Sequence, residues 1–193
     1  MLYRFFHLLF SLFFKVFYGY QVRGYENIPP EGPFIICANH TSWFDPPLTG
    51  CLVPVNNQVH FMAKEELFAF PVLGFIIKRL GAFPVKRNTA DRKAIRQALK
   101  ILESGGVVGL FPEGTRIKTG ELGKPLQGAA LIAIKSDKPV VPMAIKWPPK
   151  LFQPVTVSIG APVTFQSEGK GALETVSNQI MDEIKKQWVT LRR

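Results

Sequence analysis

Two hydrophobic patterns alternate along the chain. Short unbroken apolar runs predict buried strands, and longer segments with apolar residues at every third or fourth position predict amphipathic helices. The predicted strands are residues 34–38, 59–62, 107–111, 140–146 and 155–159, the last one alternating and therefore more exposed. The predicted helices are residues 89–104, with a cap at Asn88 or Thr89, and residues 127–135 and 172–191. This alternation predicts a single α/β domain with a largely parallel central sheet flanked by helices.

The amino-terminal segment differs in composition from the rest, because residues 1–18 hold six of the 16 phenylalanines. Its polar residues Arg4, His7, Ser11 and Lys15 are spaced three and four apart, so a helix would place them on one narrow stripe. The remaining circumference is apolar. We expect an amphipathic helix in a membrane interface, with its phenylalanines and leucines among the acyl chains and its cations toward the phosphates.

Two other placements of this segment remain open, a membrane span and a helix packed on its own domain. A span is less favoured because Arg4 and Lys15 are charged. We therefore divide the chain into an N-terminal interfacial membrane helix (residues 1–20) and an α/β domain (residues 21–193). The expected location is the cytoplasmic face of the cell membrane, as a peripheral or monotopic protein.

A second apolar stretch covers residues 67–80, and its Pro71 should end one short helix and begin another. Periodicity does not distinguish a buried helix here from a membrane-facing one. The stretch could equally line a channel for an acyl chain.

Length and composition fit one globular domain with a single core: the chain has 193 residues, of which 47% are hydrophobic. The formal net charge of +10 favours anionic partners, such as lipid headgroups, phosphorylated substrates, an acidic carrier protein or nucleic acid. The cations lack the aromatic interleaving of an RNA-binding sheet and any helix-turn-helix pattern, so we expect no nucleic-acid partner.

The cysteines and histidines argue against a disulfide framework and a zinc site. Cys37 and Cys51 lie in apolar runs and favour a reducing compartment. The three histidines are scattered without the spacing of metal ligands. We expect neither a metal nor another cofactor.

The sharpest candidate for chemistry is His40, which follows the first buried strand, with Asp45 five residues on. A carboxylate that accepts from one ring nitrogen leaves the other nitrogen able to take a proton. Asp45 precedes proline, which is also typical of a helix N-cap. Ser42 lies nearby but lacks the Gly-x-Ser-x-Gly turn of a nucleophile. A base without a protein nucleophile should act on a substrate hydroxyl or on water.

Cations and small polar residues follow later strands, at the edge where ligands of parallel sheets collect. Residues 111–116 offer Glu113, Gly114, Thr115 and Arg116, a set able to bind a phosphate monoester. Residues 81–87 end in two further cations. Each segment could also be an ordinary turn with solvated charges.

These segments together resemble the glycerolipid acyltransferases, most closely the bacterial 1-acyl-sn-glycerol-3-phosphate (lysophosphatidic acid) acyltransferases. Four blocks stand in the family's order between residues 39 and 144. The matching residues are Asn39, His40 and Asp45; Gly81, Phe83, Val85 and Arg87; Phe111, Pro112, Glu113, Gly114, Thr115 and Arg116; and Val141, Pro142 and Ala144.

The resemblance implies transfer of an acyl chain from acyl-ACP or acyl-CoA to the sn-2 hydroxyl of lysophosphatidic acid, giving phosphatidic acid. It implies that His40 is the general base, that Asp45 orients it, and that Lys64 stabilises the thioester carbonyl or the oxyanion. The acceptor phosphate would be bound by Arg87, Glu113, Gly114, Thr115 and Arg116. Another lysolipid or glycerol-3-phosphate as acceptor, a membrane-surface thioesterase and a non-enzymatic binder of anionic lipid remain alternatives.

Overall fold

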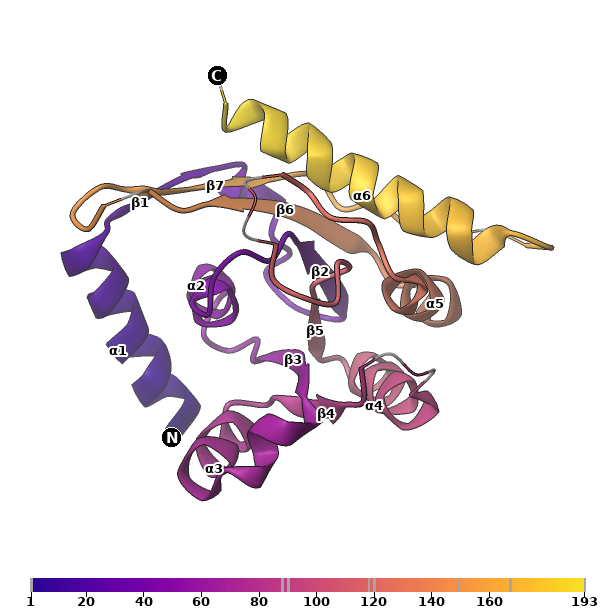
Figure 1. The fold of residues 1–193 in the computed structure, drawn as a ribbon, viewed down its shortest axis with the longest axis horizontal. Helices are drawn as coiled ribbons and strands as arrows, with labels where there is room; N and C mark the ends of the chain where they lie inside the picture. The colour runs from indigo at the N-terminus through magenta and orange to yellow at the C-terminus, as the bar shows by residue number, and fades with distance from the viewer. Residues whose placement is uncertain are drawn as a thin grey trace.

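The computed structural model describes residues 2–87, 89, 91–117, 119, 121–148, 150–166 and 168–192. It contains one seven-stranded sheet with helices on both faces (Figure 1). The helices are α1 (Leu2–Phe17), α2 (Asp45–Leu52), α3 (Pro71–Arg79), α4 (Arg92–Glu103), α5 (Gln127–Ser136) and α6 (Ala172–Thr190), with short 3-10 helices η1 (Tyr25–Asn27) and η2 (Glu65–Ala69). The strands are β1 (Tyr20–Arg23), β2 (Phe34–Ala38), β3 (Val59–Lys64), β4 (Phe83–Val85), β5 (Val107–Leu110), β6 (Val140–Lys146) and β7 (Val155–Ile159).

The sheet is largely parallel, as the sequence predicts. Its strand order is β1-β7-β6-β2-β5-β3-β4, and only β6 and β7 pair antiparallel. Strand β2 lies in the middle, paired with β5 on one side and β6 on the other, so that Cys37 lies opposite both Leu110 and Pro142. The carboxyl ends of β2, β5 and β6 therefore meet at one edge.

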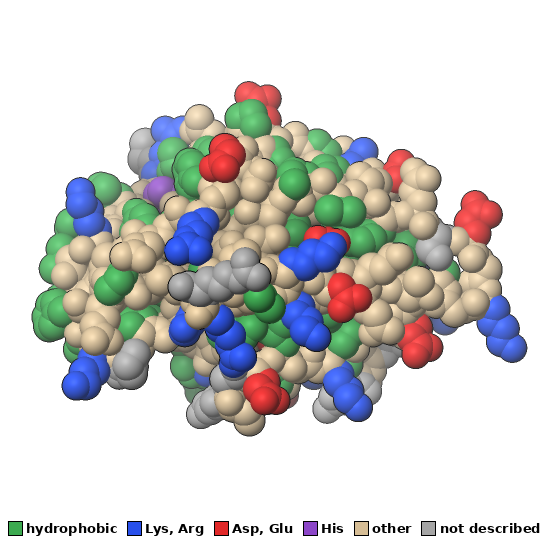
Figure 2. Space-filling view, turned by 90° about the horizontal axis from the view of Figure 1, so that it is seen from above, with side chains coloured by type: hydrophobic (Ala, Val, Ile, Leu, Met, Phe, Trp, Pro, Cys, Tyr) green, Lys and Arg blue, Asp and Glu red, His purple; other side chains and the backbone are tan. Residues whose placement is uncertain are grey.

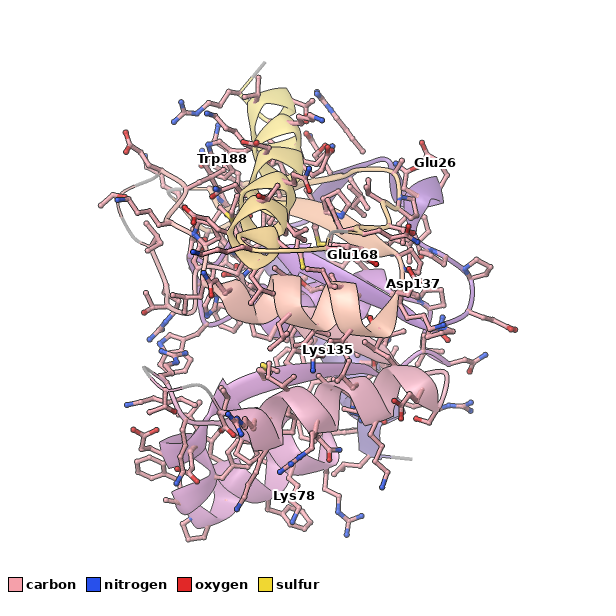
Figure 3. The ribbon with its side chains drawn as sticks, turned by 90° about the vertical axis from the view of Figure 1, so that its right-hand side faces the viewer. Glu26, Lys78, Lys135, Asp137, Glu168 and Trp188 are labelled. Atoms are coloured by element: carbon pink, nitrogen blue, oxygen red, sulfur yellow. The ribbon has the colours of Figure 1, made fainter. Side chains whose placement is uncertain are left out.

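The two faces of the sheet are covered by different sets of helices. On one face α4, α5 and α6 pack against alternate strand residues, including Ile35 and Val108 (Figure 3). On the other face α1 and α2 pack against the intervening residues, including Phe34 and Ile36. Every residue of β2 is buried, which explains its unbroken apolar run.

Helix α1 packs on its own domain through one side only. Phe14 is fully buried, and Phe10 and Phe13 pack on the same core cluster, which includes α2. The side turned away from the domain exposes large apolar residues: Phe5, Leu8, Leu9, Leu12 and Val16. No helix within the described ranges is both long enough and apolar enough to span a membrane.

The polar stripe of α1 lies between these two sides, and its inner part contacts the protein rather than open solvent. His7 Nε2 lies 3.4 Å from the carbonyl oxygen of Val53, and Arg4 donates a 3.1 Å hydrogen bond to Asn56 Oδ1. The segment that follows α2 thus supplies an acceptor for Arg4. Lys15 is exposed.

Three local predictions differ from the structure. Strand β7 is buried rather than exposed, since the unpredicted β1 pairs with it and removes it from the edge of the sheet. Strand β4 was also not predicted, because it has only three residues and one is proline.

Helix α4 is capped by Asp91, whose side chain accepts from two amides of the first turn; Thr89 is not the cap, and Asn88 lies outside the described residues. Pro71 does begin a helix after a short 3-10 turn, as predicted.

Candidate active site

His40 leaves the sheet through a segment that is bonded to the neighbouring strand. The Asn39 side chain accepts from the amide of Ile145 at 2.7 Å and donates to its carbonyl oxygen at 3.0 Å. These two bonds extend the contact between β2 and β6 beyond the last residue of β2. His40 therefore begins from a fixed main-chain position at the carboxyl edge, with only 9% of its surface exposed.

The structure brings His40 and Asp45 together. The Nδ1 atom of His40 lies 2.8 Å from Asp45 Oδ2, and because a carboxylate only accepts, the ring proton lies on Nδ1. The Nε2 atom then carries the lone pair that can take a proton. The imidazole stacks on Phe111, with ring centroids 4.2 Å apart and planes 18° apart. This stacking and the Asp45 bond together determine the direction of Nε2.

Asp45 is the first residue of α2, and its carboxylate turns back toward the loop instead of capping the helix. Its Oδ2 atom also accepts from the amides of Thr41 and Ser42, each at 2.7 Å. The N-cap position belongs to Phe44, so the reading of Asp45 as N-cap is wrong. The loop geometry that the five-residue spacing requires is thus provided by the turn at residues 41–44.

Trp147 is a further residue of the site that sequence reasoning missed. Its indole Nε1 donates a 2.6 Å hydrogen bond to Asp45 Oδ1. Asp45 is completely buried, and the donors around it replace the hydration that its carboxylate loses. The available signal was position, because Trp147 directly follows β6 and so emerges at the same edge as His40.

Glu113 is buried and bonds to main-chain amides on both sides of the site. One oxygen accepts from the amide of His40 and the other from the amide of Gly123, both at 2.7 Å. Burial raises the pKa of the Glu113 carboxyl, and the two amide hydrogen bonds offset part of that rise. The amide of Ile117 donates to the His40 carbonyl oxygen at 2.8 Å. The segment after β5 is therefore bonded to the main chain of His40.

The rest of that segment is more open. Gly114 has a φ of 67°, and a Cβ atom there would clash with Leu126, so only glycine fits the turn. Thr115 is exposed. The guanidinium carbon of Arg116 lies 3.7 Å above the ring of Trp43, which is itself 63% exposed. Arg116 is thus held by stacking, which leaves its N–H groups able to reach an anion.

Lys64 is the last residue of β3, and Arg87 follows the adjacent strand β4. Lys64 Nζ lies 3.0 Å from Glu66 Oε1. The hydrogen bond from Lys64 is the main cause that holds the pKa of the Glu66 carboxyl below its usual range, and the charge of Arg87 adds to it. Arg87 is exposed. Within the described residues, no hydrogen bond or ion pair joins Lys64, Arg87 or Arg116 to the His40–Asp45 pair.

A cavity of about 680 Å³ lies between α3, β4 and α4. Phe68, Phe75 and Lys78 of the second apolar stretch line it, together with Ile101 of α4. Ile101 belongs to the core cluster under α4, whereas Phe111, on which His40 stacks, packs against the cluster on the other face. The cavity is therefore separate from the His40–Asp45 pair.

Comparison with known proteins identifies what the chain is similar to. The sequence profile of the Acyltransferase family matches residues 19–146. The 1-acyl-sn-glycerol-3-phosphate acyltransferase of Bacillus subtilis is 37% identical over 67% of this chain and 64% of its own length. The protein of the same name from Pseudomonas aeruginosa is 32% identical over 79% of this chain and 61% of its own length. The chain thus spans less than two thirds of these curated relatives.

One solved structure matches almost the whole chain. The crystal structure of the 1-acyl-sn-glycerophosphate (LPA) acyltransferase from Thermotoga maritima aligns with a TM-score of 0.76 and 30% sequence identity. The alignment covers 99% of this chain and 78% of that one. The similarity therefore includes α1 and α6 as well as the sheet.

Proposed function

The chain belongs to the acyltransferase family, and from that premise we propose that it is a 1-acyl-sn-glycerol-3-phosphate acyltransferase. It would transfer an acyl chain from acyl-ACP or acyl-CoA to the sn-2 hydroxyl of lysophosphatidic acid. The observation that carries this proposal is the buried His40–Asp45 pair, which leaves His40 Nε2 as a base beside the edge of the sheet. The names of the relatives support lysophosphatidic acid as the acceptor.

The site supports a direct transfer without an acyl-enzyme. Burial raises the pKa of the Cys37 thiol to about 12, which removes it as a nucleophile. Ser42 Oγ accepts from the amide of Phe44 at 3.1 Å, and among the described residues it makes no hydrogen bond to the His40 ring. The acceptor hydroxyl itself is then the group that His40 deprotonates.

The proposed reaction passes one proton through His40 and replaces a C–S bond by a C–O bond. The sn-2 oxygen attacks the thioester carbonyl carbon as its proton passes to His40 Nε2, and a C–O bond forms. The tetrahedral intermediate then breaks its C–S bond, and the proton on Nε2 goes to the departing thiolate. Asp45 stabilises the imidazolium during both halves and keeps the ring in the required tautomer. The reaction consumes no metal or redox cofactor.

Lys64 is the proposed donor to the oxyanion, and Arg87 and Arg116 the proposed ligands of the acceptor phosphate, with Thr115 and the Gly114 turn beside them. For Lys64 to act, its ammonium exchanges Glu66 for the oxyanion, which is feasible because solvent screens that exposed pair. Glu113 contributes indirectly, since its carboxylate is occupied by two amides.

An acceptor panel tests the proposal. Purified protein is given acyl-ACP or acyl-CoA together with lysophosphatidic acid, glycerol-3-phosphate or another lysolipid, and the products are resolved by mass. We expect phosphatidic acid to form fastest from lysophosphatidic acid. Free fatty acid released at one rate with and without acceptor would instead assign a thioesterase that uses the same base on water.

We also place α1 on a membrane surface, through the side that exposes Phe5, Leu8, Leu9, Leu12 and Val16. In Figure 1 this helix forms the left edge of the molecule, and Figure 2 shows hydrophobic side chains at that same end, with lysines and arginines both at that end and nearer the middle. Helix α3, with Val72 and Phe75 exposed, forms the lower left corner of Figure 1. Apolar side chains flanked by cations suit an anionic bilayer.

Liposome flotation tests this placement. The double variant Leu8→Glu, Leu12→Glu should lose binding to vesicles that contain phosphatidylglycerol, because two charges would enter the acyl region. The matched control is Val189→Glu on α6, which is 44% exposed but lies on the other face of the sheet. Equal binding by both variants would show that α1 is not the membrane contact.

A further inference from the structure

Trp147 holds the oxygen of Asp45 that His40 does not use. Oδ2 serves His40, Thr41 and Ser42, whereas Oδ1 accepts from the Trp147 indole at 2.6 Å. A carboxylate bonded at both oxygens has a fixed plane, and that plane sets the line along which the imidazole donates. With Oδ1 unbonded and buried, the group would lose a charge-assisted hydrogen bond and could rotate.

The indole itself is held by aromatic rings of α1 and of Tyr18, which directly follows α1. Its ring lies edge-on to Tyr18, with centroids 5.3 Å apart, and tilted to Phe14 at 6.0 Å. Phe44, the residue before Asp45, lies 6.0 Å from the same indole and also 6.0 Å from Phe14. Helix α1 thus touches both the residue that donates to Asp45 and the residue that precedes it.

From these contacts we propose that Trp147 is a positioning residue, through which the packing of α1 sets the orientation of Asp45 and of the His40 imidazole. This inference rests on the proposed function for its catalytic consequence. Trp147 acts through Asp45, and its indole lies on the side of the carboxylate opposite the imidazole bond. Its loss should therefore lower kcat and leave KM for both substrates nearly unchanged.

Two substitutions separate the hydrogen bond from the packing. Trp147→Phe keeps an aromatic ring against α1 but removes the N–H donor. Trp147→His keeps a donor, because the imidazole overlays the five-membered half of indole and places Nε2 where Nε1 was. We expect kcat to fall about tenfold in W147F, the size typical of a lost bond to a charged acceptor, and to recover at least half in W147H at pH 8. Wild-type kcat in W147F, or equal losses in both variants, would overturn the proposal.

A double-mutant cycle tests the link to α1. Phe14→Leu should lower kcat in the wild type but add little in W147F, because both changes act through one contact. Phe6→Leu, two turns earlier on the same helix, is the matched control, since the Phe6 ring contacts Phe5 and Phe10 rather than Trp147. Additive effects of F14L and W147F would show that α1 does not act through the indole.

The geometric part can be checked without any acyl-transfer assay. The indole N–H of Trp147 gives one resonance in a ¹⁵N–¹H spectrum, identified by its loss in W147F. It should move upfield in Asp45→Ala and shift in F14L, but not in F6L. These shifts combined with no transfer to any acceptor would refute the proposed function alone. A resonance indifferent to D45A would refute the role of Trp147, whatever the reaction.

Discussion

The His40 base and the cations differ in burial and in hydrogen bonding, although both lie at the carboxyl edge of one sheet. Asp45 is fully buried, and His40 is 9% exposed and bonded through its ring, its amide and its carbonyl oxygen. Arg87 and Thr115 are exposed, and within the described residues Lys64 pairs with the exposed Glu66.

The difference indicates which part of the site is organised before substrate binds. Fixing an imidazole to a carboxylate in advance removes a reorganisation cost from the chemical step. Exposed cations, in contrast, remain hydrated until the phosphate of the substrate replaces their water. Substitutions in the first group should therefore lower kcat, and substitutions of the proposed phosphate ligands Arg87, Thr115 and Arg116 should raise KM.

The largest effect is expected for His40→Ala. Removal of the base should lower kcat by about 10³-fold, within the range for general base catalysis, with KM little changed. The assay follows labelled acyl chains into phosphatidic acid, and thermal unfolding of the variant serves as the folding control. A folded variant with wild-type turnover would eliminate the proposed mechanism.

Asp45→Asn should be next, with a loss of kcat that is severe but smaller than that of H40A, because the imidazole remains while its tautomer and orientation are no longer set. An asparagine side chain accepts through its oxygen only, so the substitution disrupts bonds from Thr41, Ser42 or Trp147. Its NH2 group would also favour the His40 tautomer without a proton on Nδ1. Single-turnover kinetics with bound acceptor isolates the chemical step. If D45N raised KM and spared kcat, the contrast between the two groups would be wrong.

Arg116→Ala should act on binding, with KM for lysophosphatidic acid about tenfold higher and a smaller change in kcat, because one charged contact to phosphate is lost. Arg116→Lys keeps the charge but not the planar stack on Trp43, and should lie between. KM for the acyl donor is the internal control and should stay constant. A loss confined to kcat would move Arg116 into the organised group.

The smallest effect is a pH dependence of stability at Glu113. Because burial raises the pKa of its carboxyl in the folded protein, the folded state holds this proton more tightly than the unfolded chain does. The contribution is favourable at low pH and is lost as pH rises through the folded-state pKa. The free energy of unfolding of the wild type should therefore fall, relative to Glu113→Gln, as pH rises above the ordinary carboxyl pKa and through the raised pKa of the folded protein. Urea titrations at several pH values measure it, and a gap that grows with pH would contradict the assignment.

The sequence predicted much of the fold because strong local patterns matched the tertiary environment. The unbroken run of β2 reflects burial on both faces, and the period of α4 reflects a helix with one covered side. Strands β1 and β4 were missed because they are short, and their strand conformation depends on pairing with β7 and β3. Such pairing is a long-range contact that periodicity does not record.

In the site, the pairing of His40 with Asp45 could be predicted, since both lie within one short segment. The partners of Glu113 could not, because the bond to the amide of Gly123 depends on how the segment after β5 folds back. Trp147 was missed for a similar reason: 102 positions separate it from Asp45 along the chain. Trp147 reaches Asp45 because β6 lies beside β2, and the sequence does not show that adjacency.

Only two residues, Tyr18 and Gly19, separate α1 from β1, and β1 is paired along its length with β7. Gly19 turns the corner with a φ of 60°, and its amide remains bonded to the carbonyl oxygen of Phe14. The orientation of α1 relative to the domain is consequently fixed, so the helix and the domain tilt together. Any surface on which α1 rests meets the domain from one fixed direction, so the distance from that surface to the imidazole is a constant of the architecture.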